Sequence, residues 1–464
     1  MKLPNRRKLL TGVASAAFGS AFPFIARSKN RDIPPNIVFI LADDLGYADI
    51  GVYGQTQFRT PHIDKLATQS VILEQAYANS AVCSATRVAL MTGRYQYRLR
   101  VGLEEPIGPE EHKLGLPEEH PTLPSLLKNA GYGTALIGKW HLGYLPAYSP
   151  MKSGYEEFFG NFGGAIDYFS HKGFSATRDG LYQRDTQIEE QGYYTQLITT
   201  HAKTYLRNRS KDRPFFLSLH YTAPHWPWEG PEDFEISKNL KSLFHYDGGT
   251  LQKYGEMVEA LDAAVGDVLL CLDGLGLSEN TIVIFTSDNG GERFSNTWPF
   301  SGQKTELLEG GIRVPALIRW PGRLPENKRS DLVCMTMDWL PTLLSAARAQ
   351  EDKNYPSDGM DILPALYGFT FVKPRKLYWR YKAHDQKAMR HANFKYLKIA
   401  ENEFLFDILK DTRERANLKE LYPDVFTALK NDWEEWNKTM LPITDDVHTH
   451  WIKSSNQADH YKPN

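Results

Sequence analysis

The stretch Asn36-Ile37-Val38-Phe39-Ile40-Leu41-Ala42-Asp43-Asp44 decides the expected fold. Its apolar run, residues 37–41, does not alternate with polar residues, which is typical of a parallel strand that is buried on both faces. The run leads directly into the two carboxylates Asp43 and Asp44. The stretch therefore predicts a central strand with polar chemistry at its carboxyl end.

The same pattern recurs along the first three quarters of the chain. Further apolar runs cover residues 134–137, 215–219, 281–285 and 315–318, and helix-like segments cover residues 122–129, 195–206 and 254–272. Each apolar run is predicted to be a buried parallel strand. Strand–helix alternation over this length predicts an α/β fold, with a large, doubly wound, mostly parallel sheet flanked by helices.

The character of the chain changes after about residue 347. Short strand-like segments cover residues 376–381, 394–399 and 404–407, and a helical pattern covers residues 425–437. We therefore predict a catalytic α/β domain over 31–346, a smaller C-terminal antiparallel α+β subdomain over 347–440 and a tail over 441–464.

The composition is that of an ordinary soluble globular protein. Of 464 residues, 41% are hydrophobic and 24% charged, and the net charge of −2 does not favour a nucleic-acid or membrane-surface binder. The three cysteines are too few for a disulfide framework. Cys271 and Cys334 lie in apolar surroundings and are interpreted as small buried side chains, whereas Cys83 does not.

The amino terminus has the pattern of an export signal. Basic residues within 2–8 precede a weakly apolar run over 9–26, so residues 1–30 are predicted to be a signal peptide, and Arg6-Arg7 resembles a twin-arginine signal. The alternative is a retained membrane anchor, but Gly12, Gly19 and Pro23 make a poor spanning helix. We expect an exported protein, periplasmic or extracellular, without membrane attachment after cleavage.

Polar residues follow four of the predicted strands. Asp43-Asp44 follows the first, Lys139 and His141 follow residues 134–137, His225 follows residues 215–219, and Asp288-Asn289 follows residues 281–285. Carboxyl ends of parallel strands meet at one edge of a sheet, where ligands bind. Asp43, Asp44, Asp288 and Asn289 offer only oxygen atoms, a set that suits calcium or magnesium rather than zinc. The alternative for each pair is a helix cap or a turn.

The remaining candidates form an anion site. Lys139, His141, His225 and Lys304 are expected at the same edge, where lysines can neutralise the oxygens of a tetrahedral anion and a histidine can protonate a leaving alkoxide. Cys83 lies just before a predicted helix over about 85–91, and a helix N-terminus favours an anion. On its own, Cys83 could equally be a buried thiol.

The stretch Cys83-Ser84-Ala85-Thr86-Arg87, followed by Thr92-Gly93-Arg94, resembles the signature of the formylglycine-dependent (type I) sulfatases of the alkaline phosphatase superfamily. Further stretches similar to the family occur in the family's order: Asn36 to Gly46, Thr60-Pro61-His62-Ile63-Asp64, Gly138-Lys139-Trp140-His141-Leu142-Gly143, Pro224-His225, Ser287-Asp288-Asn289-Gly290, and Lys304 ahead of Glu309 to Pro315. Ala85 and Thr86 stand where the family commonly has Pro and Ser, which puts recognition by the modifying enzyme in question.

The resemblance implies an alkaline phosphatase-like fold and a specific chemistry. A formylglycine-generating enzyme would oxidise Cys83 to formylglycine, whose hydrated aldehyde carries two hydroxyls: one attacks sulfur, and the second expels sulfate. Asp43, Asp44, Asp288, Asn289 and the modified Cys83 would hold one calcium ion. Arg87 would hold the nucleophile and metal region in place. Lys139, His225 and Lys304 would contact the sulfate, with His225 or Lys304 as the acid, and His141 would contact the modified side chain.

Two other functions compete with a sulfatase. The first is a phosphatase or phosphonate hydrolase of the same superfamily, although two-metal phosphatases commonly have Asp-His where this chain has Asp288-Asn289. The second is a non-catalytic carbohydrate-binding descendant, which would have broken catalytic positions, and this chain has none. The sequence leaves oligomeric state open.

A sulfated carbohydrate is the expected substrate. Trp226 and Trp228 beside His225, together with Asp167-Tyr168, suit a sugar, and residues 160–169 resemble polysaccharide sulfatases, including those acting on galactans such as carrageenan. The alternative is that these aromatic side chains pack the sheet edge. Which sugar, which sulfate position, and exo or endo action stay open.

Overall fold

The computed structural model describes residues 34–108, 113–175, 179–368 and 374–452. The predicted signal peptide and the end of the predicted tail, residues 453–464, lie outside the described residues. None of the helices in the described ranges is long and apolar enough to cross a bilayer.

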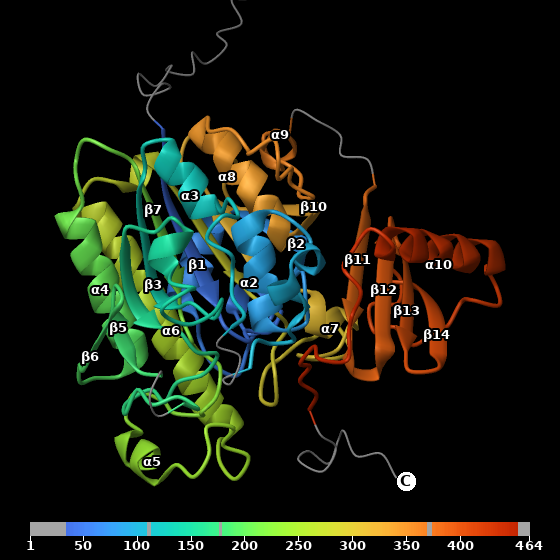
Figure 1. Ribbon diagram of the computed structural model, residues 1–464, viewed down its shortest axis with the longest axis horizontal. Coiled ribbons are helices and arrows are strands. Elements are labelled where there is room, and N and C mark those ends of the chain that lie inside the picture. The colour runs from blue at the N-terminus through green and yellow to red at the C-terminus, as the bar shows by residue number, and fades with distance from the viewer. Residues whose placement is uncertain (1–33, 109–112, 176–178, 369–373, 453–464) are drawn as a thin grey trace, which may run out of the picture. The chain divides into compact units, whose positions relative to one another are not determined.

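A ten-stranded, mostly parallel sheet forms the larger part of the fold (Figure 1), in the order β10-β2-β9-β8-β1-β7-β3-β4-β5-β6. Its strands are β1 (Asn36–Ala42), β2 (Val71–Tyr77), β3 (Gly133–Lys139), β4 (Glu157–Asn161), β5 (Leu181–Gln183), β6 (Thr186–Ile188), β7 (Phe215–His220), β8 (Thr281–Ser287), β9 (Ala316–Arg319) and β10 (Lys328–Met335). β1 lies near the middle and pairs in parallel with β7 and β8. The predicted α/β fold class is confirmed.

One predicted strand runs in the opposite direction. The apolar run at 315–318 was expected to be parallel, but β9 pairs antiparallel with both β2 and β8. That expectation was wrong because an apolar run reports burial on both faces, and a buried strand has this pattern in either direction. β2 and β10 were not anticipated: β2 is interrupted by Glu74 and Gln75, and β10 is exposed over much of its length.

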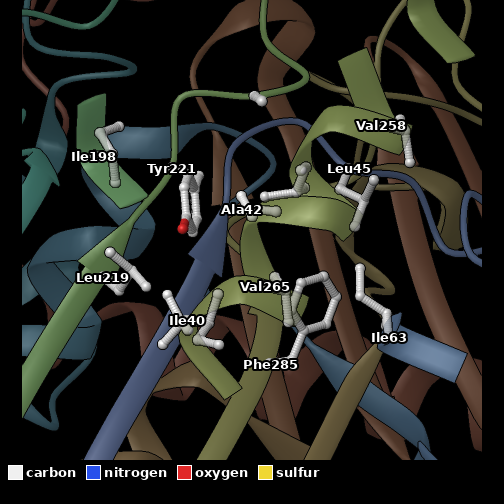
Figure 2. Close-up of a cluster of buried hydrophobic side chains, with 14 of the residues drawn as sticks. Ile40, Ala42, Leu45, Ile63, Ile198, Leu219, Tyr221, Val258, Val265 and Phe285 are labelled. Atoms are coloured by element: carbon white, nitrogen blue, oxygen red, sulfur yellow. The ribbon is translucent and has the colours of Figure 1, made fainter. Parts of the chain in front are cut away.

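Helices cover both faces of this sheet because successive residues of a strand point to opposite sides. Val38 and Ile40 of β1 face a core shared with α1 (Pro61–Thr68), α4 (Tyr194–Asn208) and α6 (Leu251–Gly274). Figure 2 shows Ile40 and Phe285 of the sheet close to Val265 of α6. Each such fully buried side chain contributes about 1.5–3 kcal/mol.

Ile37 and Phe39 point to the other face. Their core includes side chains of α2 (Cys83–Thr92), α3 (Leu123–Asn129), α8 (Trp339–Ala347) and α9 (Leu363–Leu366). Two short helices, α5 (Phe234–Asn239) and α7 (Glu309–Ile312), lie in the connections that follow β7 and β8.

A second sheet follows these elements and is antiparallel throughout, as predicted. It consists of β11 (Lys376–Tyr381), β12 (Gln386–His391), β13 (Phe394–Ile399) and β14 (Asn402–Asp407), and α10 (Pro423–Asn437) packs on it through Leu429 and Trp433. Leu377 and Trp379 share a further core with Cys83 and Ala85 of α2. Residues of α2 therefore belong to hydrophobic cores of both sheets.

A buried charge cluster joins the two sheets. Nζ of Lys395, on β13, lies 2.9 Å from Oε1 of Glu309 and 2.9 Å from Oε1 of Glu414. Glu309 Oε2 also accepts hydrogen bonds from the Tyr77 hydroxyl, at 2.6 Å, and from Arg313, at 2.9 Å. Burial alone would raise the pKa of Glu309, but Lys395 and Arg313 lower it to about 2. The cluster is stable only while its charges stay paired.

We predict that Lys395→Met lowers the free energy of unfolding by about 3–5 kcal/mol, because it leaves Glu309 and Glu414 buried without their shared cation. Lys398→Met, on the same strand, is the matched control: Lys398 pairs with Asp385, whose side chain is 61% exposed. An exposed pair is worth about 0–1 kcal/mol. Urea unfolding of both variants measures the difference, and equal losses would contradict the account.

Candidate active site

The strands whose ends carry the predicted site residues are neighbours in the large sheet, in the order β8-β1-β7-β3. Their carboxyl ends therefore lie side by side, and α2 and the segment around residue 304 complete the group. All ten predicted site residues are at most 4% exposed: Asp43, Asp44, Cys83, Arg87, Lys139, His141, His225, Asp288, Asn289 and Lys304. The contacts below show that the structure brings them into one cluster.

Each carboxylate of the cluster is paired with a cation. Asp43 Oδ2 lies 2.5 Å from Lys139 Nζ, and Asp44 Oδ2 lies 2.7 Å from Lys304 Nζ. Arg87 donates from Nε and Nη2 to Oδ2 of Asp288, at 3.0 and 2.8 Å. Its third nitrogen donates to the Lys139 carbonyl at 3.1 Å.

The two acids that flank the cluster titrate differently. Burial would raise the pKa of Asp44, but Lys304 and His225 beside it bring the pKa down to about 2. Burial and the neighbouring Asp43 raise the pKa of Asp288 to about 7, against the opposing effect of Arg87. The neighbouring cations therefore favour the ionised form of Asp44 more strongly than that of Asp288.

Two oxygens in the cluster suit a metal ion. Asp43 Oδ1 and Asn289 Oδ1 are buried and accept no hydrogen bond, which is costly for polar atoms unless a cation or water satisfies them. Asn289 Nδ2 donates to Asp44 Oδ1 at 2.7 Å, which ties the amide to the neighbouring carboxylate. An all-oxygen set of this kind fits a hard divalent cation.

His225 borders the same space. Atoms of Asp43, Asp44 and His225 lie within 4.8 Å of one another, so a metal ion could also contact the imidazole. We favour the oxygen set for a hard cation, because Asn289 Oδ1 and Asp43 Oδ1 are the unsatisfied atoms. His225 Nδ1 lies 2.7 Å from the Trp226 carbonyl, so it carries the proton and turns Nε2 toward Asp44. Burial and the nearby Lys304 hold the pKa of His225 well below its usual value.

Cys83 is the first residue of α2, one turn before Arg87. Its Sγ lies 3.3 Å from Nδ1 of His141, whose Nε2 lies 3.2 Å from the Ile107 carbonyl. Since Nε2 must donate to that carbonyl, Nδ1 is free to accept a hydrogen bond from the thiol. Burial raises the pKa of the Cys83 thiol despite the nearby Lys139 and Lys304, so the encoded cysteine stays protonated.

Gly164 leaves the room that His141 needs. A Cβ at this position would lie 2.5 Å from Cε1 of the His141 ring, far inside van der Waals contact. Gly164 therefore allows the imidazole to lie beside Cys83.

A cavity of about 260 Å³ opens above Cys83. Its described polar lining includes His141, His225 and Lys304, and its apolar wall includes Phe174, Trp226 and Phe244. His448 and His450 from the C-terminal segment also line it. Sequence reasoning missed Phe174, Phe244 and the two histidines as site residues, because no periodicity or motif connects them with the strand ends.

Two other residues differ from the sequence expectation. Trp228 is 1% exposed and packs edge-on against Tyr254 and Phe294, and so belongs to the core. His220, at the end of β7, is not among the predicted site residues. Its Nδ1 lies 3.2 Å from Arg87 Nη1 and its Nε2 lies 3.0 Å from Ser218 Oγ, so it positions the guanidinium.

The sequence profile of the sulfatase family matches residues 35–349. The chain belongs to the sulfatase family. It is 33% identical to the N-acetylgalactosamine-6-sulfatase of Canis lupus familiaris over 412 residues, which cover 81% of this chain and 75% of that protein. It is 30% identical to the arylsulfatase J of Mus musculus, with 88% of this chain and 77% of that protein covered.

A solved structure supports the same family assignment. The crystal structure of Ps i-CgsB, also solved in complex with k-i-k-neocarrahexaose, superposes with a TM-score of 0.81 at 29% identity, covering 93% of this chain and 98% of that one. The expected type I sulfatase family and enzyme class are confirmed. This sulfatase hydrolyses sulfate esters, and the buried cluster at the strand ends is its candidate active site.

Proposed function

We propose that this sulfatase removes sulfate from a sulfated oligosaccharide or polysaccharide. Its nucleophile would be a formylglycine, made from Cys83, and one calcium ion would be bound beside it. The observation that carries the proposal is the position of Cys83, at the floor of a cavity whose polar end holds His225 and Lys304 and whose wall holds Trp226. Aromatic walls suit the apolar faces of sugar rings. The names of the N-acetylgalactosamine-6-sulfatase relatives and the neocarrahexaose complex of Ps i-CgsB support a carbohydrate substrate.

The calcium ion would be held by the carboxylates of Asp43, Asp44 and Asp288 and by the amide oxygen of Asn289, with the modified side chain at position 83 completing its ligands. In the protein itself, the negative charges of the three carboxylates are balanced by the positive charges of three side chains: Arg87, Lys139 and Lys304. A divalent ion would therefore leave the site with a net charge of two positive, which suits an anionic ester. Such an ion supplies charge neutralisation and lowers the pKa of a bound hydroxyl.

Conversion of Cys83 to formylglycine would replace a weak nucleophile with a stronger one. As encoded, Cys83 is a buried, protonated thiol and a weak nucleophile. The hydrated aldehyde of formylglycine would offer one hydroxyl for attack on sulfur, with loss of the sugar alkoxide, and a second hydroxyl whose deprotonation re-forms the aldehyde and releases sulfate. A formylglycine-generating enzyme would be the partner during maturation.

The active-site residues would each have a separate role in the hydrolysis. Lys304 lines the cavity and would face sulfate oxygens. Lys139 is not among the described lining residues; it pairs with Asp43 and would act on the sulfate through the charge of the cluster. Lys304 and His225 both line this end of the cavity and are the two candidate acids for the leaving oxygen: Lys304 as it stands, and His225 once its Nε2 has taken up a proton. His141 Nδ1, beside the side chain of residue 83, would accept a proton as sulfate leaves. Arg87, through its ion pair with Asp288, would fix the position of α2, and so of residue 83, relative to the carboxylates.

Export belongs to the same proposal. The predicted signal over residues 1–30 would deliver the enzyme to the periplasm or the cell exterior, where polysaccharides are met. The runner-up function is phosphate ester hydrolysis at the same cluster, and it is tested together with the nucleophile.

We predict that kcat/KM for 4-nitrophenyl sulfate exceeds that for 4-nitrophenyl phosphate by about 100-fold or more, which corresponds to about 2.7 kcal/mol in transition-state binding. Cys83→Ala should lower sulfate turnover by about 1,000-fold or more, because it removes the attacking group. Cys271→Ala, a half-buried cysteine outside the cluster, is the matched control and should keep wild-type turnover. Preference for phosphate, or wild-type turnover by Cys83→Ala, would overturn the scheme.

Calcium binding predicts a stability shift that does not depend on activity. Adding calcium at about 100 times its dissociation constant to EDTA-treated protein should stabilise the fold by about 2.7 kcal/mol. Asp43→Asn should lose most of this shift in thermal unfolding. Asp49→Asn is the control, because Asp49 is equally buried but its oxygens accept hydrogen bonds from Gly46, Ser295, Tyr254 and Asn296. An undiminished shift in Asp43→Asn would place the ion elsewhere.

A further inference from the structure

The C-terminal segment, residues 441–452, crosses from α10 to the cavity above Cys83, and we call it the C-terminal strap. Its backbone is bonded to a segment of the catalytic region at residues 104–105. His448 N donates to Glu104 Oε2 at 3.0 Å, Glu105 N donates to the His448 carbonyl at 3.0 Å, and His450 N donates to the Glu105 carbonyl at 2.5 Å. This exchange resembles a short parallel strand pair, and it fixes the backbone on both sides of Thr449.

Side chains hold the strap from two further directions. Lys382 Nζ donates to the carbonyls of Thr444, Asp445 and Val447, at 3.1, 2.9 and 2.6 Å. Val447 and Ile452 are 3% and 1% exposed, so the strap also anchors itself through apolar burial. The strap is therefore a fixed wall of the cavity.

The strap presents two imidazoles to the cavity. His448 and His450 line it together with Cys83, His225 and Lys304, and the His450 ring lies nearly parallel to Phe244, with 6.1 Å between centroids and 12° between planes. Phe244 in turn stacks on Tyr246, at 5.6 Å and 12°. The two histidines of the strap and Phe244 therefore belong to the same part of the cavity lining.

The described lining of the cavity is one-sided in charge. It contains Lys304 and the imidazoles of His141, His225, His448 and His450, and these described lining residues include no carboxylate. His225, His141 and Lys304 lie at the reacting end, beside Cys83 and Asp44. His448 and His450 can therefore offer ring N–H donors to the cavity, and the hydrolysis proposed above assigns them no role.

We propose that His448 and His450 form a subsite for a second anionic group, a sulfate or a carboxylate, on the sugar that carries the scissile ester or on its neighbour. The proposal rests on the carbohydrate substrate proposed above and deepens it to a doubly anionic substrate. An imidazole ring carries at least one N–H donor in either charge state, so both side chains can donate a hydrogen bond to an anion. The cavity, at about 260 Å³, is just below the usual volume range of small-molecule sites and suits a compact unit, and His448 and His450 line the same cavity as Cys83.

The strap cannot be tested by deletion. Its bonds to Glu105 continue, two residues on, to Ile107, whose carbonyl accepts from His141 and whose amide donates to Ser84 Oγ. Removing the strap would therefore disturb the catalytic histidine as well. Side-chain substitutions leave the backbone bonds in place, and Asp445→Ala is a matched control, because the Asp445 side chain is exposed and does not line the cavity.

The experiment compares two oligosaccharides that differ only in a second sulfate on the reacting sugar or its neighbour. For the wild type, kcat/KM should favour the disulfated substrate, and the His448→Ala/His450→Ala double variant should reduce the disulfated-to-monosulfated ratio by about tenfold or more. The single variants should fall between, and Asp445→Ala should keep the wild-type ratio. Thermal unfolding of each variant shows whether the fold is intact.

The outcomes separate this inference from the proposed function. An unchanged ratio in the double variant, whatever the absolute loss of activity, overturns the subsite and assigns the strap a structural role only. A wild-type preference for the monosulfated sugar overturns it as well. If the wild type hydrolyses 4-nitrophenyl sulfate but neither sugar, the carbohydrate substrate itself is wrong and the subsite falls with it.

Discussion

Three carboxylates buried side by side at the carboxyl edge of a parallel sheet are the constraint on which the rest of this structure depends. Asp43, Asp44 and Asp288 are each 1% exposed or less, and such charges are tolerated only when cations reach them. Arg87 of α2 forms an ion pair with Asp288. Lys139 and Lys304 pair with the two aspartates that follow β1. Because Arg87 lies one helical turn after Cys83, the ion pair that neutralises Asp288 also fixes the cysteine at the edge of the cluster.

The C-terminal half of the chain takes part in the site. Gln386 of β12 accepts a hydrogen bond from Leu307 N and donates to the Thr305 carbonyl, both at 2.9 Å, which holds the segment that carries Lys304. Trp379 of β11 donates to the Ala78 carbonyl at 2.8 Å, just ahead of α2. The antiparallel sheet thus stabilises two segments that approach the cluster from outside the large sheet, and the strap completes the cavity wall.

Much of the reacting end could be predicted from sequence because it is encoded locally. A strand that is buried on both faces has an apolar run as its sequence pattern. The polar residues that follow several parallel strands, such as Asp43 and His141, must meet at the carboxyl edge of the sheet. The direction of β9 could not be read in this way, since both faces of a buried strand are apolar in either orientation. The cavity wall was equally hidden: Phe174, Phe244 and His450 come together only through tertiary packing, and each alone resembles an ordinary loop residue.

The most direct test of the central claim, that Cys83 is converted into the nucleophile of this cluster, is the mass of the tryptic peptide of residues 66–87. The protein should be produced together with a formylglycine-generating enzyme, and a second sulfatase from the same cells shows that the enzyme works. The account predicts a peptide about 18 Da lighter than the encoded sequence, the change from a thiol to an aldehyde. An unmodified mass, with the second sulfatase modified, would contradict it.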